Sequence, residues 1–419
     1  MPSFSFVHTA DLHLGSPFST LGINNPELAS VMRSATFEAF ERVVDLCLDN
    51  KVDFLLVAGD VFDGADRSIR AQITFLNGLK KLGEAGIESF VVHGNHDSLD
   101  LWSKTLEWPR GVHVFGDKVE TVPVNRDGVL VAQVQGISYP QRDERRNLAR
   151  LFSKNSPGFH LGLLHANVGS DTGHEPYAPC TLEDLITSGM DYWALGHVHS
   201  RRILSDGVPT VLYPGNTQGR NIQETGERGC YLVKVEDDHH VGFEFHATDV
   251  VRWAMEEVSI NSLETEQDLL KTLEDRCRRI SEEQSGRSVI VRIVLSGHGP
   301  LYSLLSNPNT LEELLEMIRE SGMSRSPFVW VEQIRSTVHP EVDRDERIGG
   351  GDFLGELLRC AKELQGDGPE EFLKKELGPL FMDAKARGFV TLPGDSRAKA
   401  LLLRAEDMCV AGLYDEDSE

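Results

Sequence analysis

Short apolar runs alternate with longer amphipathic stretches along the first hundred residues. Residues 3–9, 53–58 and 90–92 are short and rich in Phe, Val and Leu, as expected of strands buried on both faces. Between these runs, residues 27–50 and 68–83 carry apolar side chains at helical spacing. This strand–helix alternation predicts right-handed crossovers in a largely parallel sheet.

The pattern changes after about residue 110. Short apolar runs separated by turns predict hairpin structure between residues 112 and 137. A polar, basic stretch at 142–150 predicts the start of a helix. Further short apolar runs predict strands at 161–164, 192–195, 208–213 and 230–235.

The patterning divides the chain into four segments. Residues 1–250 hold the alternating strands and helices, and residues 251–337 predict a small α+β unit in the order strand, helix, strand, helix, strand. Residues 338–351 are charged and end in three glycines, which predicts a linker. Residues 352–419 predict helices with apolar faces. These faces either pack on one another or dock on a partner helix.

Composition and charge narrow the class of protein. The formal net charge of −24 argues against tight binding of DNA by bulk electrostatics, because such affinity comes from Lys and Arg neutralising phosphates. The six cysteines lie far apart with no Cys-x-x-Cys, and the N-terminus leaves no room for a signal peptide. No apolar run approaches the roughly 20 residues of a membrane span. We therefore expect a cytoplasmic protein with reduced thiols and no membrane segment.

Polar side chains follow five of the predicted strands. Because sites in such sheets form beyond the carboxyl ends of the strands, we expect these side chains to meet at one rim. They are Asp11, His13, Asp60, Asn95, His165, His197 and His199. Carboxylates, an amide oxygen and imidazoles, with no thiolate, suit manganese, iron or zinc in a non-structural site. Seven candidates exceed the needs of one ion, so the set predicts two metals about 3.5–4 Å apart.

The longer phrases around these residues carry a family resemblance. The segments His8 to Gly15, Gly59 to Asp63, His93 to Asp97 and Tyr213 to Asn216 resemble the Mre11/SbcD exonuclease subunits, which are calcineurin-like metallophosphoesterases. Their bacterial YhaO-type members are the most similar in these segments. The resemblance is specific over about the first 240 residues and architectural beyond them. It implies an α/β fold: a four-layer α/β/β/α metallophosphoesterase sandwich with a small α+β capping domain and a helical C-terminal tail.

The resemblance also implies a role for each candidate residue. Asp11, His13, Asp60 and His199 would bind the first metal. Asp60, Asn95, His165 and His197 would bind the second, with Asp60 bridging the two ions. His96 would protonate the leaving oxygen, and Asp63 would orient His96 and favour its cationic form. Asn216 and Arg220 are candidates to contact the phosphate of the substrate.

The function implied is that of a two-metal DNA exonuclease working in the 3′→5′ direction, with endonuclease activity on single strands. Manganese is the expected metal, and Fe²⁺ or Zn²⁺ would also suit the ligands. The resemblance further implies DNA repair with an SMC-like coiled-coil ATPase bound through the C-terminal helices, and a homodimer. Two alternatives stay open. A small-molecule phosphodiesterase or phosphatase would use the same chemistry, and a non-catalytic scaffold would hold the ATPase without hydrolysis.

Overall fold

The computed structural model divides the chain into two compact units. The first comprises Met1–Met255, Ile280–Val291 and Ser326–Glu332, and the second comprises Glu256–Arg279, Arg292–Arg325 and Gln333–Glu419. The described residues are 2–16, 26–64, 68–101, 107–170, 175–284, 286–323, 326–366, 368–378 and 393–416.

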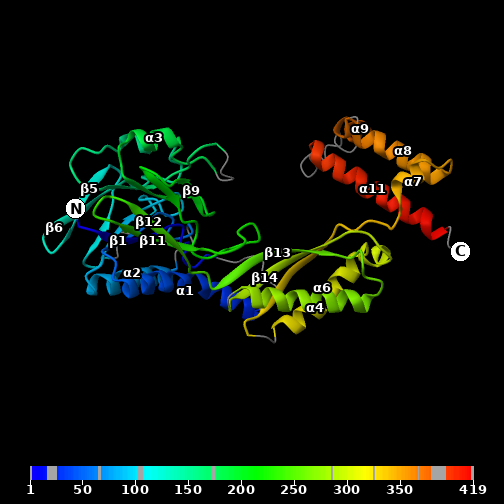
Figure 1. The fold of residues 1–419 in the computed structure, drawn as a ribbon, viewed down its shortest axis with the longest axis horizontal. Coiled ribbons are helices and arrows are strands. Elements are labelled where there is room, and N and C mark those ends of the chain that lie inside the picture. Colours follow the sequence, from blue (N-terminus) through cyan, green and yellow to red (C-terminus); the bar gives the residue numbers. More distant parts are fainter. Residues whose placement is uncertain are drawn as a thin grey trace. The chain divides into compact units, whose positions relative to one another are not determined.

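The first sheet contains six strands in the order β12-β11-β1-β2-β3-β4. Figure 1 labels β12, β11 and β1 of this sheet. These are β12 (Val241–Ala247), β11 (Gly229–Val235), β1 (Phe4–Thr9), β2 (Phe54–Ala58), β3 (Glu88–Val92) and β4 (Val112–Val114). Strands β1 to β4 pair in parallel, whereas β11 and β12 run antiparallel to their neighbours. The parallel centre confirms the expectation from the strand–helix alternation.

The second sheet has six strands in the order β5-β6-β7-β8-β10-β9. These are β5 (Glu120–Arg126), β6 (Val129–Gly136), β7 (His160–His165), β8 (Tyr192–Gly196), β10 (Thr210–Tyr213) and β9 (Arg202–Ser205). Pairing is parallel from β6 through β10 and antiparallel at both edges. The hairpin predicted between residues 112 and 137 is formed by β5 and β6.

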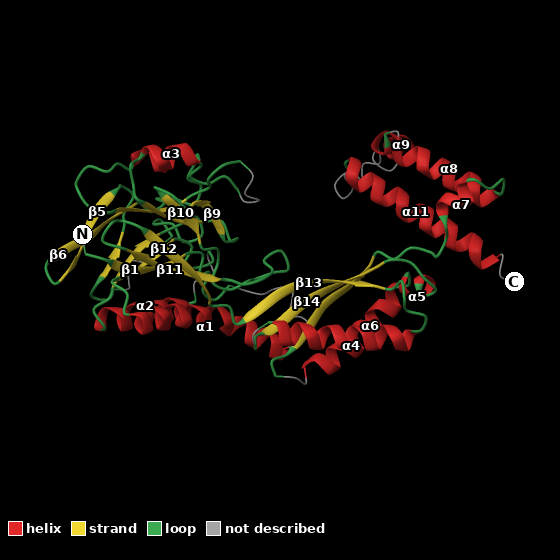
Figure 2. Cartoon of the chain, viewed as in Figure 1, coloured by secondary structure: helices red, strands yellow, loops and turns green. Residues whose placement is uncertain are grey.

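The two sheets pack face to face, and alternate residues of each strand face opposite layers. Phe6 and Leu56 join side chains from the second sheet in the central core. Their neighbours Val7 and Leu55 face outward against helices α1 (Pro26–Asn50) and α2 (Ile69–Glu84). Helix α3 (Leu182–Thr187), labelled in Figure 2, and the 3₁₀ turn η1 (Leu148–Leu151) cover the outer face of the second sheet. The result is the expected four-layer α/β/β/α sandwich.

The predicted helix start at 142–150 gives only the single turn η1. The carbonyl of Glu144 accepts a hydrogen bond from the amide of Ala178, so it is not available to a helix in this segment. The Glu144 carboxylate also binds the amide and guanidinium of Arg146, an arrangement that competes with helix formation.

A three-stranded sheet follows the sandwich, in the order β13-β14-β15. Its strands are β13 (Val251–Ser259), β14 (Ser288–Ser296) and β15 (Val329–Ser336), with helices α4 (Glu266–Glu283), α5 (Tyr302–Leu305) and α6 (Pro308–Met323) between them. The predicted order of strands and helices is present, with the short α5 added. The three strands contribute residues to both compact units.

The remaining described helices are α7 (Arg344–Ile348), α8 (Phe353–Gly366), α9 (Pro369–Glu376) and α11 (Asp395–Glu416). Helix α7 lies inside the segment predicted to be a linker. Asp343 caps it by accepting from the amide of Glu346, and Arg344 forms ion pairs with the buried Glu406 and Asp407 of α11. These contacts anchor the segment to α11. No described helix combines a membrane-spanning length with a sufficiently apolar sequence.

Candidate metal centre

Five strand ends deliver all seven predicted metal ligands to one place. Asp11 and His13 follow β1, Asp60 follows β2 and Asn95 follows β3, while His165 ends β7 and both His197 and His199 follow β8. The first three strands belong to one sheet and the last two to the other. The site therefore lies where the carboxyl ends of both sheets meet, as expected for such sheets.

The ligand atoms form two overlapping groups. In the first, Nε2 of His13 lies 3.2 Å from Nε2 of His199, and both rings group with the Asp11 carboxylate. In the second, His165 groups with Asp11 and Asp60, and its Nε2 lies 3.5 Å from Oδ2 of Asp60.

Asn95 extends the second group. Its Oδ1 lies 3.0 Å from Nε2 of His165 and 3.2 Å from Nδ1 of His197. On the other side, Nε2 of His13 lies 3.8 Å from Oδ2 of Asp60. Asp60 thus lies near both groups, which suits a carboxylate that bridges two ions.

Three of the imidazoles are fixed by a hydrogen bond on the nitrogen that faces away from the site. Nδ1 of His165 donates to the carbonyl of Ala58, at 2.9 Å, and Nε2 of His197 donates to the carbonyl of Glu175, at 2.8 Å. Nδ1 of His199 donates to the Glu224 carboxylate at 2.7 Å. In each ring the other nitrogen then carries a lone pair toward the site, the usual arrangement of metal-binding histidines.

Burial makes this collection of groups costly without a cation. Burial, together with the charge of Asp60, raises the pKa of Asp11 well above its usual value. Burial, together with the charge of Arg220 and the neighbouring histidines, lowers the pKa of His13 well below 6.5. Two acidic side chains and several imidazoles therefore face one another with little contact with water. This donor set fits divalent metal ions, which would supply the missing positive charge.

The backbone at the site is strained. Eight described residues other than glycine have positive φ, and four of these are predicted ligands: Asp11 (50°), His13 (42°), Asp60 (50°) and His197 (100°). Such conformations are uncommon outside glycine and cost free energy that the surrounding structure must offset. Their concentration here indicates that the fold places these side chains at the expense of local stability.

His96 and Asp63 form a pair beside the ligands. Nδ1 of His96 lies 2.8 Å from Oδ1 of Asp63, and the amide of His96 donates to Oδ1 of Asp60 at 2.9 Å. Burial alone would lower the pKa of His96, but the hydrogen bond to Asp63 and the charges of Asp60 and Asp63 raise it above 6.5. The side chain of His96 is 29% exposed, so it can meet a substrate. The pair has the geometry expected of a general acid and the group that orients it.

Asn216 and Arg220, the two residues predicted to contact the phosphate, make their contacts mainly with other protein groups around the site. Asn216 is fully buried, its Nδ2 donates to the carbonyl of Gln218 and to Glu224, and its Oδ1 accepts from Arg228. Its amide is therefore engaged on both sides within the protein. Arg220 lies beside the site, with Nη1 of its guanidinium 3.3 Å from Oδ2 of Asp63.

One contributor was missed by reasoning from sequence. Glu224 holds the ring of His199, yet it lies in the loop between β10 and β11, outside every polar block that follows a strand. In the sequence, Arg220 and Glu224 are four residues apart, a spacing typical of an ordinary surface ion pair. No signal in a single sequence distinguishes this pair at the site from a surface ion pair.

Comparisons with known proteins identify the family of the chain. Residues 4–201 match the calcineurin-like phosphoesterase family, and residues 253–339 match the middle domain of the metallophosphoesterase YhaO. The "Uncharacterized metallophosphoesterase YhaO" of Bacillus subtilis (strain 168) is 37% identical over 332 residues, which are 79% of this chain and 81% of that protein.

Two more distant proteins are also similar. The DNA double-strand break repair protein Mre11 of Aeropyrum pernix is 28% identical over 244 residues, which are 54% of this chain and 56% of that protein. The crystal structure of a dimetal phosphatase from Danio rerio aligns with a TM-score of 0.35 at 15% identity, covering 57% of this chain and 94% of that chain. The identity to YhaO over most of both chains decides the family: this chain belongs to the calcineurin-like metallophosphoesterases, phosphoester hydrolases whose fold implies two divalent metals.

Proposed function

We propose that this protein is a manganese-dependent DNA exonuclease that acts in DNA repair, cutting in the 3′→5′ direction with some endonuclease activity on single strands. The observation that carries the proposal is the grouping of all seven predicted ligands beside His96, which Asp63 orients. The similarity to proteins named for DNA double-strand break repair supports DNA as the substrate. Free cysteines throughout the chain support a cytoplasmic location.

The seven predicted ligands would bind two metal ions. Asp11, His13, Asp60 and His199 would hold one metal, and Asp60, Asn95, His165 and His197 the other. Bound metals supply a hydroxide nucleophile and neutralise charge on the phosphate. Asn95 contributes a neutral oxygen, which limits the negative charge facing a phosphate.

His96 would complete the reaction on the leaving side. Its cationic form is favoured by Asp63, whose own pKa is held well below its usual range: burial alone would raise that pKa, but hydrogen bonds from His96 and Ser16 and the charge of Arg220 lower it. Asp63 therefore stays ionised while His96 gives up its proton. Proton donation to the leaving oxygen is typically worth about 10²–10⁴-fold in rate.

A second candidate is a small-molecule phosphodiesterase or phosphatase. The observation that favours it is the net charge of −24, which opposes the binding of a long polyanion. The residues beyond the sandwich, including the α4–α6 unit and helices α7, α8, α9 and α11, are more than a small substrate requires. A non-catalytic scaffold is the weakest alternative, because all seven ligands and His96 are present.

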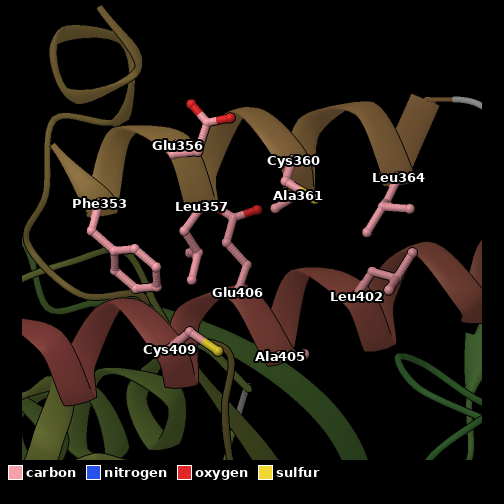
Figure 3. Close-up of a pocket in the computed structure, with 10 residues that line it drawn as sticks. All are labelled: Phe353, Glu356, Leu357, Cys360, Ala361, Leu364, Leu402, Ala405, Glu406 and Cys409. Carbon is pink, nitrogen blue, oxygen red and sulfur yellow. The ribbon is translucent and has the colours of Figure 1, made fainter. Parts of the chain in front are cut away.

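We also propose an SMC-like coiled-coil ATPase as partner, bound through the C-terminal helices. Helices α8 and α11 enclose a groove of about 320 Å³ (Figure 3). Its lining is Phe353, Glu356, Leu357, Cys360, Ala361, Leu364, Leu402, Ala405, Glu406 and Cys409. Phe353 is 71% exposed at one end of the groove. An apolar groove between two helices is the kind of surface that receives an amphipathic helix.

The partner proposal has a direct test. An SMC-like ATPase from the same genome would be co-expressed with the full chain, and the affinity measured by calorimetry. We expect Phe353→Asp with Leu357→Asp to abolish binding, because the charges would be buried in the groove. Met408→Asp is the matched control, since Met408 is 66% exposed on α11 and lies outside the groove lining. Equal affinity for the double variant would exclude this groove. The homodimer also remains a proposal, tested by sedimentation of the same preparation.

Hydrolysis tests the main proposal. Labelled single- and double-stranded oligonucleotides would be incubated beside bis-p-nitrophenyl phosphate, with manganese or with EDTA, using wild type and His96→Ala. Shortening of the oligonucleotide only with manganese and intact His96 is the expected result. Fast cleavage of the small diester with no cleavage of DNA, even with the ATPase present, would favour the small-molecule enzyme. No binding of added manganese would revive the scaffold.

A further inference from the structure

Behind His199 lies a buried carboxylate that is outside the predicted ligand set. Glu224 is only 7% exposed. Its Oε1 accepts from Nδ1 of His199 at 2.7 Å, and its Oε2 accepts from the Asn216 amide at 2.8 Å and from the backbone amide of Arg220 at 2.7 Å. Three donors thus satisfy it, which offsets the cost of burying a charge. The Oε1 contact leaves Nε2 of His199 with its lone pair toward the site.

Arg220 joins this carboxylate to the general-acid pair. Its Nη1 lies 3.3 Å from Oδ2 of Asp63, and its Nη2 lies 3.3 Å from Nδ1 of His199 and 3.7 Å from Oε1 of Glu224. The side chain is 17% exposed. One guanidinium therefore touches the residue that orients His96 and the residue that orients His199. A planar, permanently charged fork can hold two carboxylates in fixed positions, which a lysine cannot do.

We propose that Glu224 and Arg220 are positioning residues: Glu224 fixes the ring of His199 for the first metal, and Arg220 ties Glu224 to Asp63, so that this metal position and the His96 acid are held as one unit. Asn216 supports the same carboxylate from the other side. Arg220 then serves the site mainly through Asp63 and Glu224, and contact with the substrate phosphate is not its main role. The kinetic part of this inference rests on the proposed hydrolysis, and the metal-binding part does not.

Manganese binding tests the role of Glu224 without any substrate. Mn²⁺ would be titrated calorimetrically into the metal-free full chain. Loss of a partner behind a metal-binding histidine typically weakens binding about 10–100-fold, so we expect Glu224→Ala to weaken one of two equivalents by that factor. Glu224→Gln should lose less, because an amide oxygen can still accept from Nδ1 of His199.

The control is Glu227→Gln, a half-exposed carboxylate three residues along that pairs with Arg252 away from the ligands. It should bind both equivalents as wild type does. Circular dichroism would show whether each variant is folded. Wild-type affinity for both equivalents in folded Glu224→Ala overturns the proposal. If that variant does not fold, Glu224→Leu, which also removes the acceptor, takes its place, and wild-type affinity for both equivalents in that variant overturns the proposal.

Leaving-group dependence tests the role of Arg220. p-Nitrophenolate departs without a proton, whereas the alkoxide of a DNA strand needs one. A change that misplaces His96 should therefore slow the hydrolysis of DNA more than the hydrolysis of the aryl ester. We expect Arg220→Ala to lower kcat for the oligonucleotide at least tenfold more than for bis-p-nitrophenyl phosphate, with KM little changed. Arg220→Lys should recover only part of the loss. A rise in KM for both substrates with kcat unchanged would overturn the positioning role and assign Arg220 to the phosphate. If wild type cleaves no oligonucleotide, the DNA proposal fails, and the manganese titration still judges Glu224.

Discussion

Gly94→Ala is the smallest change that should disable the metal centre. Gly94 precedes Asn95, and a Cβ built on it would lie 2.7 Å from Nε2 of His165 and closer still to Oδ1 of Asp60. Side-chain Cβ atoms essentially never come within 3.0 Å of such neighbours. Neither group can retreat easily, because the His165 ring is anchored on the carbonyl of Ala58 and Oδ1 of Asp60 accepts from the amide of His96.

The magnitude follows from these two collisions. Overpacking of this kind costs typically about 1–3 kcal/mol of stability, which a protein of this size can tolerate. The catalytic cost should be larger, because a misplacement of about 1 Å can cost about 10²-fold in rate. We therefore expect a folded Gly94→Ala variant whose affinity for at least one Mn²⁺ and whose kcat each fall about 10²-fold or more.

The assay pairs manganese calorimetry with hydrolysis of bis-p-nitrophenyl phosphate. Gly207→Ala is the control, because the nearest atom to a Cβ there is the Ser205 hydroxyl at 4.0 Å. It should behave as wild type in both measurements. Two equivalents of Mn²⁺ bound at wild-type affinity by Gly94→Ala would refute the geometry on which the site rests, whatever the effect on rate.

Three further predictions concern protons and metals. Asp63→Asn should lower the raised pKa of His96, so the alkaline limb of the rate–pH profile for an alkyl diester should move to lower pH; an unmoved limb would contradict the acid role. Burial lowers the pKa of His8 to about 3, so between pH 6.5 and pH 3 this residue takes up a proton only in the unfolded chain. In EDTA the free energy of unfolding should therefore fall by up to about 1.4 kcal/mol per pH unit as the pH is lowered toward 3. His8→Phe should flatten that slope in urea titrations, and an equal slope would refute the assignment. Saturating Mn²⁺ should raise Tm, since ligand at 100-fold above Kd adds about 2.7 kcal/mol; no rise would mean that the buried donors bind no metal.

The sandwich could be predicted because its strands and helices differ in period. Phe54 to Ala58 are apolar without interruption, which marks a strand buried on both faces, and the structure buries all five. Helix α1 repeats apolar residues at helical spacing and matches its predicted range to within one residue. The grouping of the predicted ligands could be inferred from topology, because each of them stands at the end of a parallel strand.

Long-range contacts account for what could not be predicted. The charged, glycine-ended segment 338–351 was expected to be a linker, yet Arg344 finds two buried carboxylates on α11, about 60 positions later. Glu224 accepts a hydrogen bond from His199, 25 positions earlier in the chain, and no periodicity in the sequence predicts this contact. Sequence periodicity reports which face of an element is buried, and it does not report which polar partners meet once the elements have packed.

The acidic surface bears on how a substrate is held. Segment 142–150 contains four arginines, but Arg145, Arg146 and Arg150 pair with Asp143, Glu144 and Asp184. Those side chains offer little free positive charge to a DNA backbone, so phosphate affinity would come mainly from the metal centre or from a partner. Substrate binding confined to the metal centre would suit a short phosphodiester as well as a DNA end. Binding strength alone therefore cannot separate the two substrates, whereas dependence on the leaving group and on the ATPase can.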